Sequence, residues 1–297
     1  MTQTILLVGA TGMFGSRVAH HLLAQPDARV RLLVRDVGGN KDVLGPLAAG
    51  GAELIAGDLT DPASLDRATQ GVDVIVSAVQ GGPEVIIDGQ VALAAAGKRN
   101  GARRILPSDY ALDLFKATPG EHERFNMRAE ADRRIAEIGL EQVKILQGGF
   151  MDVFMPGRGT TDLDAGTIGF YGDGDLKIEV TSVEDTARMV ARVALDRTVP
   201  AGKFAFAGDH VSFRDAGAIM ARRIGRELRP VSLGSEDDLR ATMAAADRET
   251  RANLAYVLYM TNGQTALSNL QNDHYPDMRF ESFADFVAHA IPASVGG

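Results

Sequence analysis

The sequence predicts an α/β fold in which helices cover both faces of a doubly wound parallel sheet. Short apolar runs alternate with helical patterns from the first residues to about residue 146, and this alternation is typical of a parallel sheet. The first apolar run, Ile5–Val8, leads directly into a glycine-rich turn and then into a helical repeat of apolar residues. The regular alternation ends after residue 150. We therefore expect a first domain over residues 1–150, rejoined by about 178–207, and a smaller, mostly helical substrate domain over 151–297.

Three glycines lie where the first strand becomes the first helix, spaced G-x-x-G-x-x-G. Gly9 permits a tight turn, Gly12 lets the backbone approach a pyrophosphate, and Gly15 lets the helix pack closely on the strand. The start of the helix also offers unpaired N–H groups and the positive end of its dipole. The strand before and the helix after the turn predict a dinucleotide-binding site. Its expected contact residues are Gly9, Thr11, Gly12, Met13, Phe14 and Gly15.

The end of the second predicted strand, Val30–Val34, indicates which dinucleotide binds. Arg35 and Asp36 follow this strand about twenty residues after the glycines, where the adenosine ribose is recognised. A guanidinium suits the 2′-phosphate of NADP, whereas a carboxylate suits the 2′-hydroxyl of NAD. Because Arg35 comes first, we expect NADP(H). Lys41 either adds a second positive charge at this phosphate or is an ordinary solvated lysine, and the second reading is favoured.

The remaining elements follow in order along the chain. We expect a helix capped by Thr60 or Asp61 with Pro62 at its start, and a helix that Gly139 ends. The other predicted strands are Glu53–Ala56, Val72–Val76, Arg104–Leu106, Val143–Leu146 and Lys203–Ala207. The other predicted elements are helices through Ala96 and over Phe125–Ile138, a hairpin within Thr167–Gly174, and a helix through Leu195 that the segment Val180–Asp185 caps. Ligands bind outside the carboxyl ends of such strands, so Ala78, Val79 and Gln80 are expected at the cofactor as well.

Composition excludes several classes of function. With 31 basic and 39 acidic residues the formal net charge is −8, which argues against nucleic acid as a partner. The chain has no cysteine, so disulfides, thiolate nucleophiles and cysteine-ligated metals are excluded. His20 and His21 are adjacent and make a poor metal pair, and we expect no metal site. No run has the length of a membrane span, and we expect a cytoplasmic protein.

Taken in order, these motifs resemble the isoflavone-reductase-like and NmrA-like branch of the atypical short-chain dehydrogenases. The resemblance covers nearly the whole chain and rests on the glycine turn, Arg35, Pro107–Tyr110, the helix Phe125–Ile138, Gln147–Phe150 and the segments from Phe170 to Asp185. It implies an NADP(H)-binding Rossmann domain and a smaller domain that closes a substrate cleft. It also implies that Gly149 and Phe150 contact the cofactor, Phe150 against the nicotinamide ring, although core burial of Phe150 would look the same in the sequence.

One position departs from the family pattern. Family reductases carry a lysine in a stretch that resembles F-x-V-K-A-K, and this chain has Arg128 at that place within Phe125–Glu130. A desolvated lysine can act as a general base, whereas arginine stays charged. Arg128 could still stabilise a phenolate or enolate, with a surface arginine as the equal alternative. No tyrosine is followed four residues later by lysine, so the ordinary short-chain dehydrogenase mechanism is not available.

Three further side chains are candidates for the chemistry, each with a structural alternative. Tyr110 either donates its hydroxyl to the substrate or packs against the cofactor, and Ser108 either reaches the nicotinamide or substrate or caps the next turn. His122 is a candidate proton donor, with a solvated loop histidine as the favoured alternative. A group of apolar and aromatic residues is expected mostly in the core, with a substrate pocket as the alternative: Phe150, Met151, Phe154, Met155, Tyr256, Tyr259 and Met260.

The sequence therefore predicts an NADPH-dependent reductase that transfers hydride to a small aromatic substrate. Through the resemblance, that substrate is expected to be a phenylpropanoid, lignan or isoflavonoid. The alternative, which Arg128 favours, is a non-catalytic NADP(H) sensor that acts through protein contacts. An isomerase or lyase on the same fold is a third reading. A homodimer is one assembly open to test.

Overall fold

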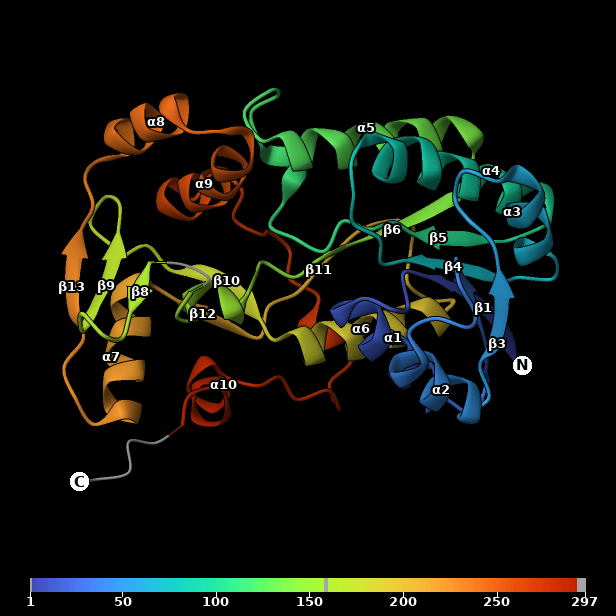
Figure 1. Cartoon of the computed structure of the whole chain (residues 1–297), viewed down its shortest axis with the longest axis horizontal. Helices are drawn as coiled ribbons and strands as arrows, with labels where there is room; N and C mark the ends of the chain where they lie inside the picture. The colour runs from blue at the N-terminus through green and yellow to red at the C-terminus, as the bar shows by residue number, and fades with distance from the viewer. Residues whose placement is uncertain (1, 158–159, 293–297) are drawn as a thin grey trace. The chain divides into compact units, whose positions relative to one another are not determined.

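The computed structural model describes residues 2–157 and 160–292, and the chain forms two compact units (Figure 1). The first unit contains the chain up to Tyr110, Asn126–Ile145 and Thr186–Phe204. The second contains Ala111–Phe125, Leu146–Asp185 and the chain from Ala205 onward. The segment Ala111–Phe125, where the strand–helix alternation breaks, thus belongs to the second unit. Each unit is built from three separate segments of sequence.

The first unit holds a seven-stranded sheet in the order β11-β6-β5-β4-β1-β2-β3. Neighbouring strands from β3 to β6 pair in parallel, with Leu7 of β1 opposite Leu32 on one side and Val76 on the other. The order runs in both directions from β1, which confirms the doubly wound α/β fold. The strands are β1 (Gln3–Val8), β2 (Ala28–Val34), β3 (Glu53–Ala56), β4 (Val74–Ser77), β5 (Arg104–Leu106), β6 (Glu141–Leu146) and β11 (Gly202–Ala205).

Helices cover both faces of this sheet. Figure 1 shows α3, α4 and α5 over one face and α1, α2 and α6 over the other. The central strands β1 and β4 are buried, as expected for strands covered on both faces. No helix in the two described ranges is both long enough and apolar enough to cross a bilayer. The helices are α1 (Met13–Leu23), α2 (Lys41–Ala49), α3 (Pro62–Thr69), α4 (Gln90–Arg99), α5 (Glu123–Ile138) and α6 (Val183–Leu195), with a π-helical turn at Glu84–Gly89 before α4.

Local sequence signals set the helix ends. The Asp61 side chain caps α3 by accepting a hydrogen bond from the Ala63 N–H at 3.0 Å, and Pro62 is the first helical residue. Gly139 follows α5 with φ of +73°, a left-handed conformation that favours glycine. The Ser182 hydroxyl accepts from the Asp185 N–H at the start of α6. These caps confirm the helix start predicted at Pro62 and the helix end predicted at Ile138, and they place the start of α6 within the segment Val180–Asp185 that the sequence predicts as its cap.

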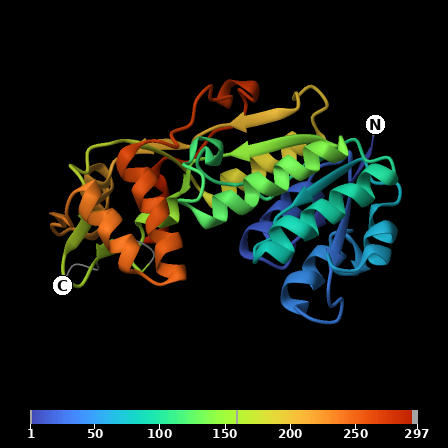
Figure 2. The same ribbon diagram turned by 90° about the horizontal axis from the view of Figure 1, so that it is seen from above.

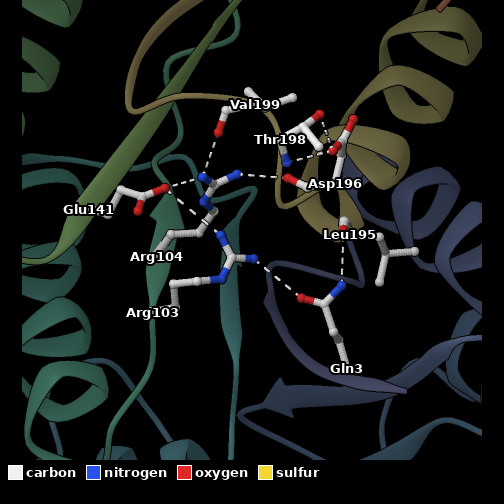
Figure 3. A network of polar contacts seen from close by, with 8 residues as sticks. All are labelled: Gln3, Arg103, Arg104, Glu141, Leu195, Asp196, Thr198 and Val199. Atoms are coloured by element: carbon white, nitrogen blue, oxygen red, sulfur yellow. Dashed lines mark hydrogen bonds and ion pairs between the residues drawn. The ribbon is translucent and has the colours of Figure 1, made fainter. Parts of the chain in front are cut away.

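A buried arginine ties the amino ends of the strands to the last segment of the first unit (Figure 3). Arg104, the first residue of β5, is almost fully buried. Its guanidinium donates to the carbonyl oxygens of Asp196 at 3.1 Å and Val199 at 2.7 Å, and it pairs with the Glu141 carboxylate at the start of β6. A buried cation is stable only when it has partners of this kind. Arg104 therefore anchors the turn between α6 and β11.

The second unit contains two three-stranded sheets, in the orders β12-β10-β7 and β13-β9-β8. Helix α7 contacts β9, β13 and α10, and α8 and α9 lie side by side (Figure 2). Its strands are β7 (Gly149–Phe150), β8 (Thr161–Asp162), β9 (Thr167–Phe170), β10 (Ile178–Thr181), β12 (Asp209–Val211) and β13 (Arg229–Ser232). Its helices are α7 (Phe213–Ile224), α8 (Glu236–Ala245), α9 (Arg248–Asn262) and α10 (Phe283–Ala290), with 3₁₀ turns at Leu114–Lys116, Met151–Phe154 and Asn272–His274.

The hairpin predicted within Thr167–Gly174 lies earlier in the chain. Strands β8 and β9 form the antiparallel pair, and Gly166, with φ of +64°, lies in the turn between them. Only Thr167–Phe170 of the predicted segment is a strand. Gly172 and Gly174 both have positive φ, so the chain turns where the sequence pattern suggested a second strand.

Candidate functional site

The glycine turn after β1 is closed by contacts of the backbone with itself. Gly9 has φ of +90°, and a Cβ there would lie 2.3 Å from the Ala78 oxygen. A Cβ on Gly15 would lie 2.1 Å from the Gly9 oxygen. Both positions therefore require glycine for packing within the chain. The turn rests against Ala78 and Val79, so the ends of β1 and β4 lie together, as the sequence predicts.

Gly12 differs from the other two glycines because no neighbour in the described chain requires it. A Cβ at Gly12 would meet only the Gly9 oxygen, at 3.4 Å, an ordinary contact. Its φ of −79° is open to any residue, and no side chain caps α1 there. Thr11, Gly12 and Met13 are exposed, Met13 by 53%. This helix start, with its backbone N–H groups and open approach, fits an anion such as a diphosphate.

Arg35 is exposed directly after β2, and its neighbour Asp36 is engaged locally. The Asp36 carboxylate accepts from the Gly38 N–H at 2.9 Å, and a Cβ on Gly39 would lie 2.6 Å from its other oxygen. Asp36 therefore closes the loop after β2. Lys41 is exposed as the first residue of α2.

The loop after β3 lies close to Arg35. Hydrogen bonds from the Thr60 hydroxyl and N–H lower the pKa of Asp58, and the nearby charge of Arg35 lowers it further. Arg35 therefore presents a positive charge beside a carboxylate that stays ionised at neutral pH. The combination of an exposed guanidinium with a locally occupied Asp36 is what a 2′-phosphate site requires.

Ser108 joins the loop after β5 to the loop after β4. Its hydroxyl donates to the Val79 oxygen at 2.8 Å, and its N–H donates to the Gln90 side-chain oxygen at 2.9 Å. The side chain is buried, and its hydroxyl hydrogen bond goes to the neighbouring loop; the cap of the next turn that the sequence suggested is not formed. Ala78 is half-buried, Val79 is buried and Gln80 is exposed.

Tyr110 and Arg128 complete a continuous set of contacts in the first unit. The Tyr110 ring lies 4.5 Å from the Phe14 ring in the first turn of α1. The Arg128 Nε–H donates to the Ser108 oxygen at 2.8 Å, and Arg128 is half-buried. Burial, together with the charge of Asp109, raises the pKa of Tyr110, so its hydroxyl stays protonated and is a donor. Among the described residues this hydroxyl has no hydrogen-bond partner.

Two buried carboxyl groups that we did not predict lie behind these residues. Asp109 and Asp132 are only 1% and 2% exposed, and the Lys144 Nζ lies 3.6 Å from an Asp132 carboxylate oxygen. Asp132 is on α5 one turn after Arg128. The sequence carried a signal, because Asp132 falls on the same helical stripe as the core residues Phe125 and Ile135.

His122 belongs to the second unit and is fully buried there. Its ring stacks on Phe125 with centroids 4.0 Å apart and meets the edge of Tyr256 at 4.3 Å. Tyr259 stacks behind, at 6.1 Å. The expectation of a solvated loop histidine is therefore wrong, because the loop before α5 folds His122 into an aromatic cluster with α9. Its role as a proton donor stays a prediction.

Gly149 and Phe150 form β7 in the second unit, where they pair with Val180 and Thr181. Phe150 is half-buried, and its contact with a nicotinamide ring stays a prediction. Most of the other apolar candidates are core residues: Met151, Phe154, Met155, Tyr259 and Met260 are all buried, and Tyr256 is half-buried. The core reading is thereby confirmed for these five residues.

Comparison with known proteins identifies the family. The model of the NmrA-like family matches residues 1–278. The chain belongs to the NmrA-like family. The resemblance drawn from the glycine turn, Pro107–Tyr110 and the later motifs is thus confirmed.

Similar proteins include several named reductases from plants. The chain is 25% identical to phenylcoumaran benzylic ether reductase IRL1 of Ginkgo biloba over 95% of this chain and 97% of that protein. It is 24% identical to pinoresinol reductase 1 of Arabidopsis thaliana over 95% of each chain. Among solved structures, the binary complex of leucoanthocyanidin reductase with NADPH from Vitis vinifera aligns with a TM-score of 0.83 and 21% identity, covering 96% of this chain and 98% of that one. This structural likeness supports the doubly wound fold.

Proposed function

We propose that the protein binds NADP(H) and reduces a small aromatic substrate of the phenylpropanoid or lignan class. The observation that carries the proposal is the turn at Gly9–Gly15. Packing within the chain requires glycine at residues 9 and 15, whereas at Gly12 only an approaching ligand would require it. Membership of the NmrA-like family and the names of the similar reductases support the proposal.

Different residues of the first unit would bind different parts of NADP(H). The N–H groups of Thr11 and Met13 would hold the diphosphate, while that of Gly12 donates to the Gly9 oxygen at 3.1 Å. Arg35 would hold the 2′-phosphate, with Asp36 kept away by its bond to the Gly38 N–H. Ala78, Val79 and Gln80 follow β4 at the same edge of the sheet. NADPH supplies a hydride when bound.

Arg128 would supply a positive charge at the reacting end of the substrate, and Tyr110 would supply a hydroxyl proton. Arg128 is held by the Ser108 oxygen at 2.8 Å, so its guanidinium is a fixed positive charge that stabilises an oxyanion on the substrate. Arginine stays protonated, and Arg128 therefore orients and stabilises but does not exchange a proton. Tyr110, with its pKa raised, keeps a hydroxyl proton to donate.

The fixed charge of Arg128 also supports a second candidate function. A site without an exchangeable proton at this position suits a non-catalytic NADP(H) sensor. Such a protein would bind NADPH and NADP+ with different affinities and pass the difference to another protein. The reductase would turn over a substrate, and the sensor would not.

The test mixes purified protein with NADPH and, separately, pinoresinol, a phenylcoumaran and an isoflavone, and follows the absorbance of the reduced nicotinamide. We expect turnover with at least one of them, and a loss of kcat of about 100-fold in Arg128→Ala, as for other oxyanion-stabilising groups. Arg133→Ala is the matched control, because Arg133 lies on the same helix, is exposed and pairs with Glu130 and Glu137. Tight, redox-selective nucleotide binding without turnover would favour the sensor.

A further inference from the structure

Four charged side chains from three elements meet behind the carboxyl end of β5. Asp109 follows β5, Arg128 and Asp132 lie one turn apart on α5, and Lys144 lies on β6. All four belong to the first unit. The proposed function uses only Arg128, and the two buried aspartates need an explanation of their own.

The two carboxyl groups are buried next to each other. Each carboxyl group affects the pKa of the other, so the two side chains lie close together. In the described part of the chain none of their four oxygens has a donor at ordinary hydrogen-bond distance, although the Lys144 Nζ lies 3.6 Å from an Asp132 oxygen. Two carboxylates are acceptors only, so a bond between them requires a proton on one of them. Two buried negative charges side by side would also repel each other.

Burial also favours a proton on the pair, because it raises the pKa values of both carboxyl groups. Burial, and then the charge of Asp132, raise the pKa of Asp109 well above its usual range, against the opposing charges of Arg128 and Lys144. Burial raises the pKa of Asp132 to about 6, while Lys144 opposes the rise. We assign the proton to Asp109, because Lys144 lies beside Asp132 and favours its ionised form. Tyr110, next to Asp109 on the same loop, stays protonated.

We propose that Asp109 and Asp132 share one proton at neutral pH and act as positioning residues that keep Arg128 against the Ser108 oxygen, on which the proposed reductase depends. In this state the cluster carries two positive charges, on Arg128 and Lys144, and one negative charge, next to Ser108 and Tyr110. Loss of the shared proton would make the cluster neutral. It would also give Arg128 a carboxylate partner in Asp109 that competes with the Ser108 oxygen.

The shared proton can be tested without any substrate. Infrared spectra of the full chain at pH 7, in H₂O and D₂O, should show the carbonyl stretch of one protonated carboxylic acid. That band should be lost in Asp109→Asn, should shift in Asp132→Asn because the acid on Asp109 then lacks its carboxylate partner, and should be unchanged in Asp66→Asn, an exposed aspartate paired with Arg99. Absence of the band in the wild-type protein, its persistence in Asp109→Asn, or an unshifted band in Asp132→Asn would overturn the proposal. Two separate variants guard against a failure of either one to fold.

The consequence for turnover is tested by the pH profile. We expect wild-type kcat to fall on the alkaline side as the pair loses its proton, with no change in NADPH affinity. Asp109→Asn, whose amide can donate to Asp132 but cannot ionise, should lose this alkaline fall. An unchanged alkaline fall in Asp109→Asn would refute the positioning role. If no substrate is turned over, the proposed reductase fails on that result, whereas the infrared band still decides whether the pair holds a proton.

Discussion

The carbonyl oxygen of Gly9 lies 2.1 Å from the point that a Cβ on Gly15 would occupy. This contact fixes the start of α1 on the end of β1 and leaves no room for a larger residue. A Cβ on Gly12, three residues from each, would meet only the Gly9 oxygen at an ordinary contact distance of 3.4 Å, so its role in ligand binding and its role in folding can be separated by experiment.

Alanine substitutions at Gly15 and Gly12 should affect different properties, the first stability and the second NADPH binding. Gly15→Ala should lower the free energy of unfolding by about 3 kcal/mol or more, because backbone atoms cannot move aside as side chains do. Gly12→Ala should fold normally and weaken NADPH binding by about tenfold or more, which is about 1.4 kcal/mol. Denaturant unfolding and calorimetric titration measure the two effects. Gly45→Ala, in open space on α2, is the control, and an unchanged affinity in Gly12→Ala would argue against a diphosphate at this turn.

Arg35→Ala should weaken NADPH binding by about 10- to 100-fold, as expected for the loss of a charge-assisted bond to phosphate. NADH affinity should stay nearly constant, because NADH has no 2′-phosphate. Calorimetry with both nucleotides gives the ratio. Arg29→Ala, an exposed arginine near the other end of the same strand, should change neither affinity. Equal losses for NADPH and NADH would contradict the assignment of Arg35.

The buried aspartate pair should make the protein less stable as pH rises. Both pKa values are raised in the folded state, so the folded protein holds protons that the unfolded chain releases above its ordinary carboxyl pKa. Each retained proton lowers the free energy of unfolding by about 1.4 kcal/mol per pH unit. Between pH 5 and pH 8, wild-type stability should therefore fall more steeply than that of Asp109→Asn. Urea unfolding at several pH values measures both slopes, and Asp66→Asn should run parallel to the wild type.

Arg104→Met should lower the free energy of unfolding by about 2–4 kcal/mol. The substitution removes the guanidinium that donates to the oxygens of Asp196 and Val199, and it leaves Glu141 with the more distant Arg103, at 3.8 Å. Arg99→Ala removes only an exposed pair with Asp66 and should cost less than about 1 kcal/mol. Equal effects of the two substitutions in denaturant unfolding would show that the buried network contributes no more than a surface pair.

Most of the first unit could be predicted because its signals are local. Apolar runs and turn glycines placed the strands, and single residues such as Asp61 and Gly139 set helix ends. The hairpin near Gly172 was misplaced because glycines with positive φ end strand β9 instead of linking it to another strand.

The aspartate pair escaped prediction for a different reason. Asp109 and Asp132 meet only after β5 and α5 pack together, and each one alone resembles an ordinary acidic residue. The position of Asp132 on an apolar stripe was the available clue. His122 was misread in a similar way, since its polar loop gave no hint that Phe125 and Tyr256 enclose it.

The discontinuous path of the chain has a consequence for how the protein is made. Arg104 leaves the ribosome long before Asp196 and Val199, its two carbonyl partners. Until they are synthesised, the sheet lacks both its edge strand β11 and the groups that accept this guanidinium. Completion of the first unit must therefore wait until β11, Gly202–Ala205, has been synthesised, and a nascent chain that pauses earlier would be a natural client for chaperones.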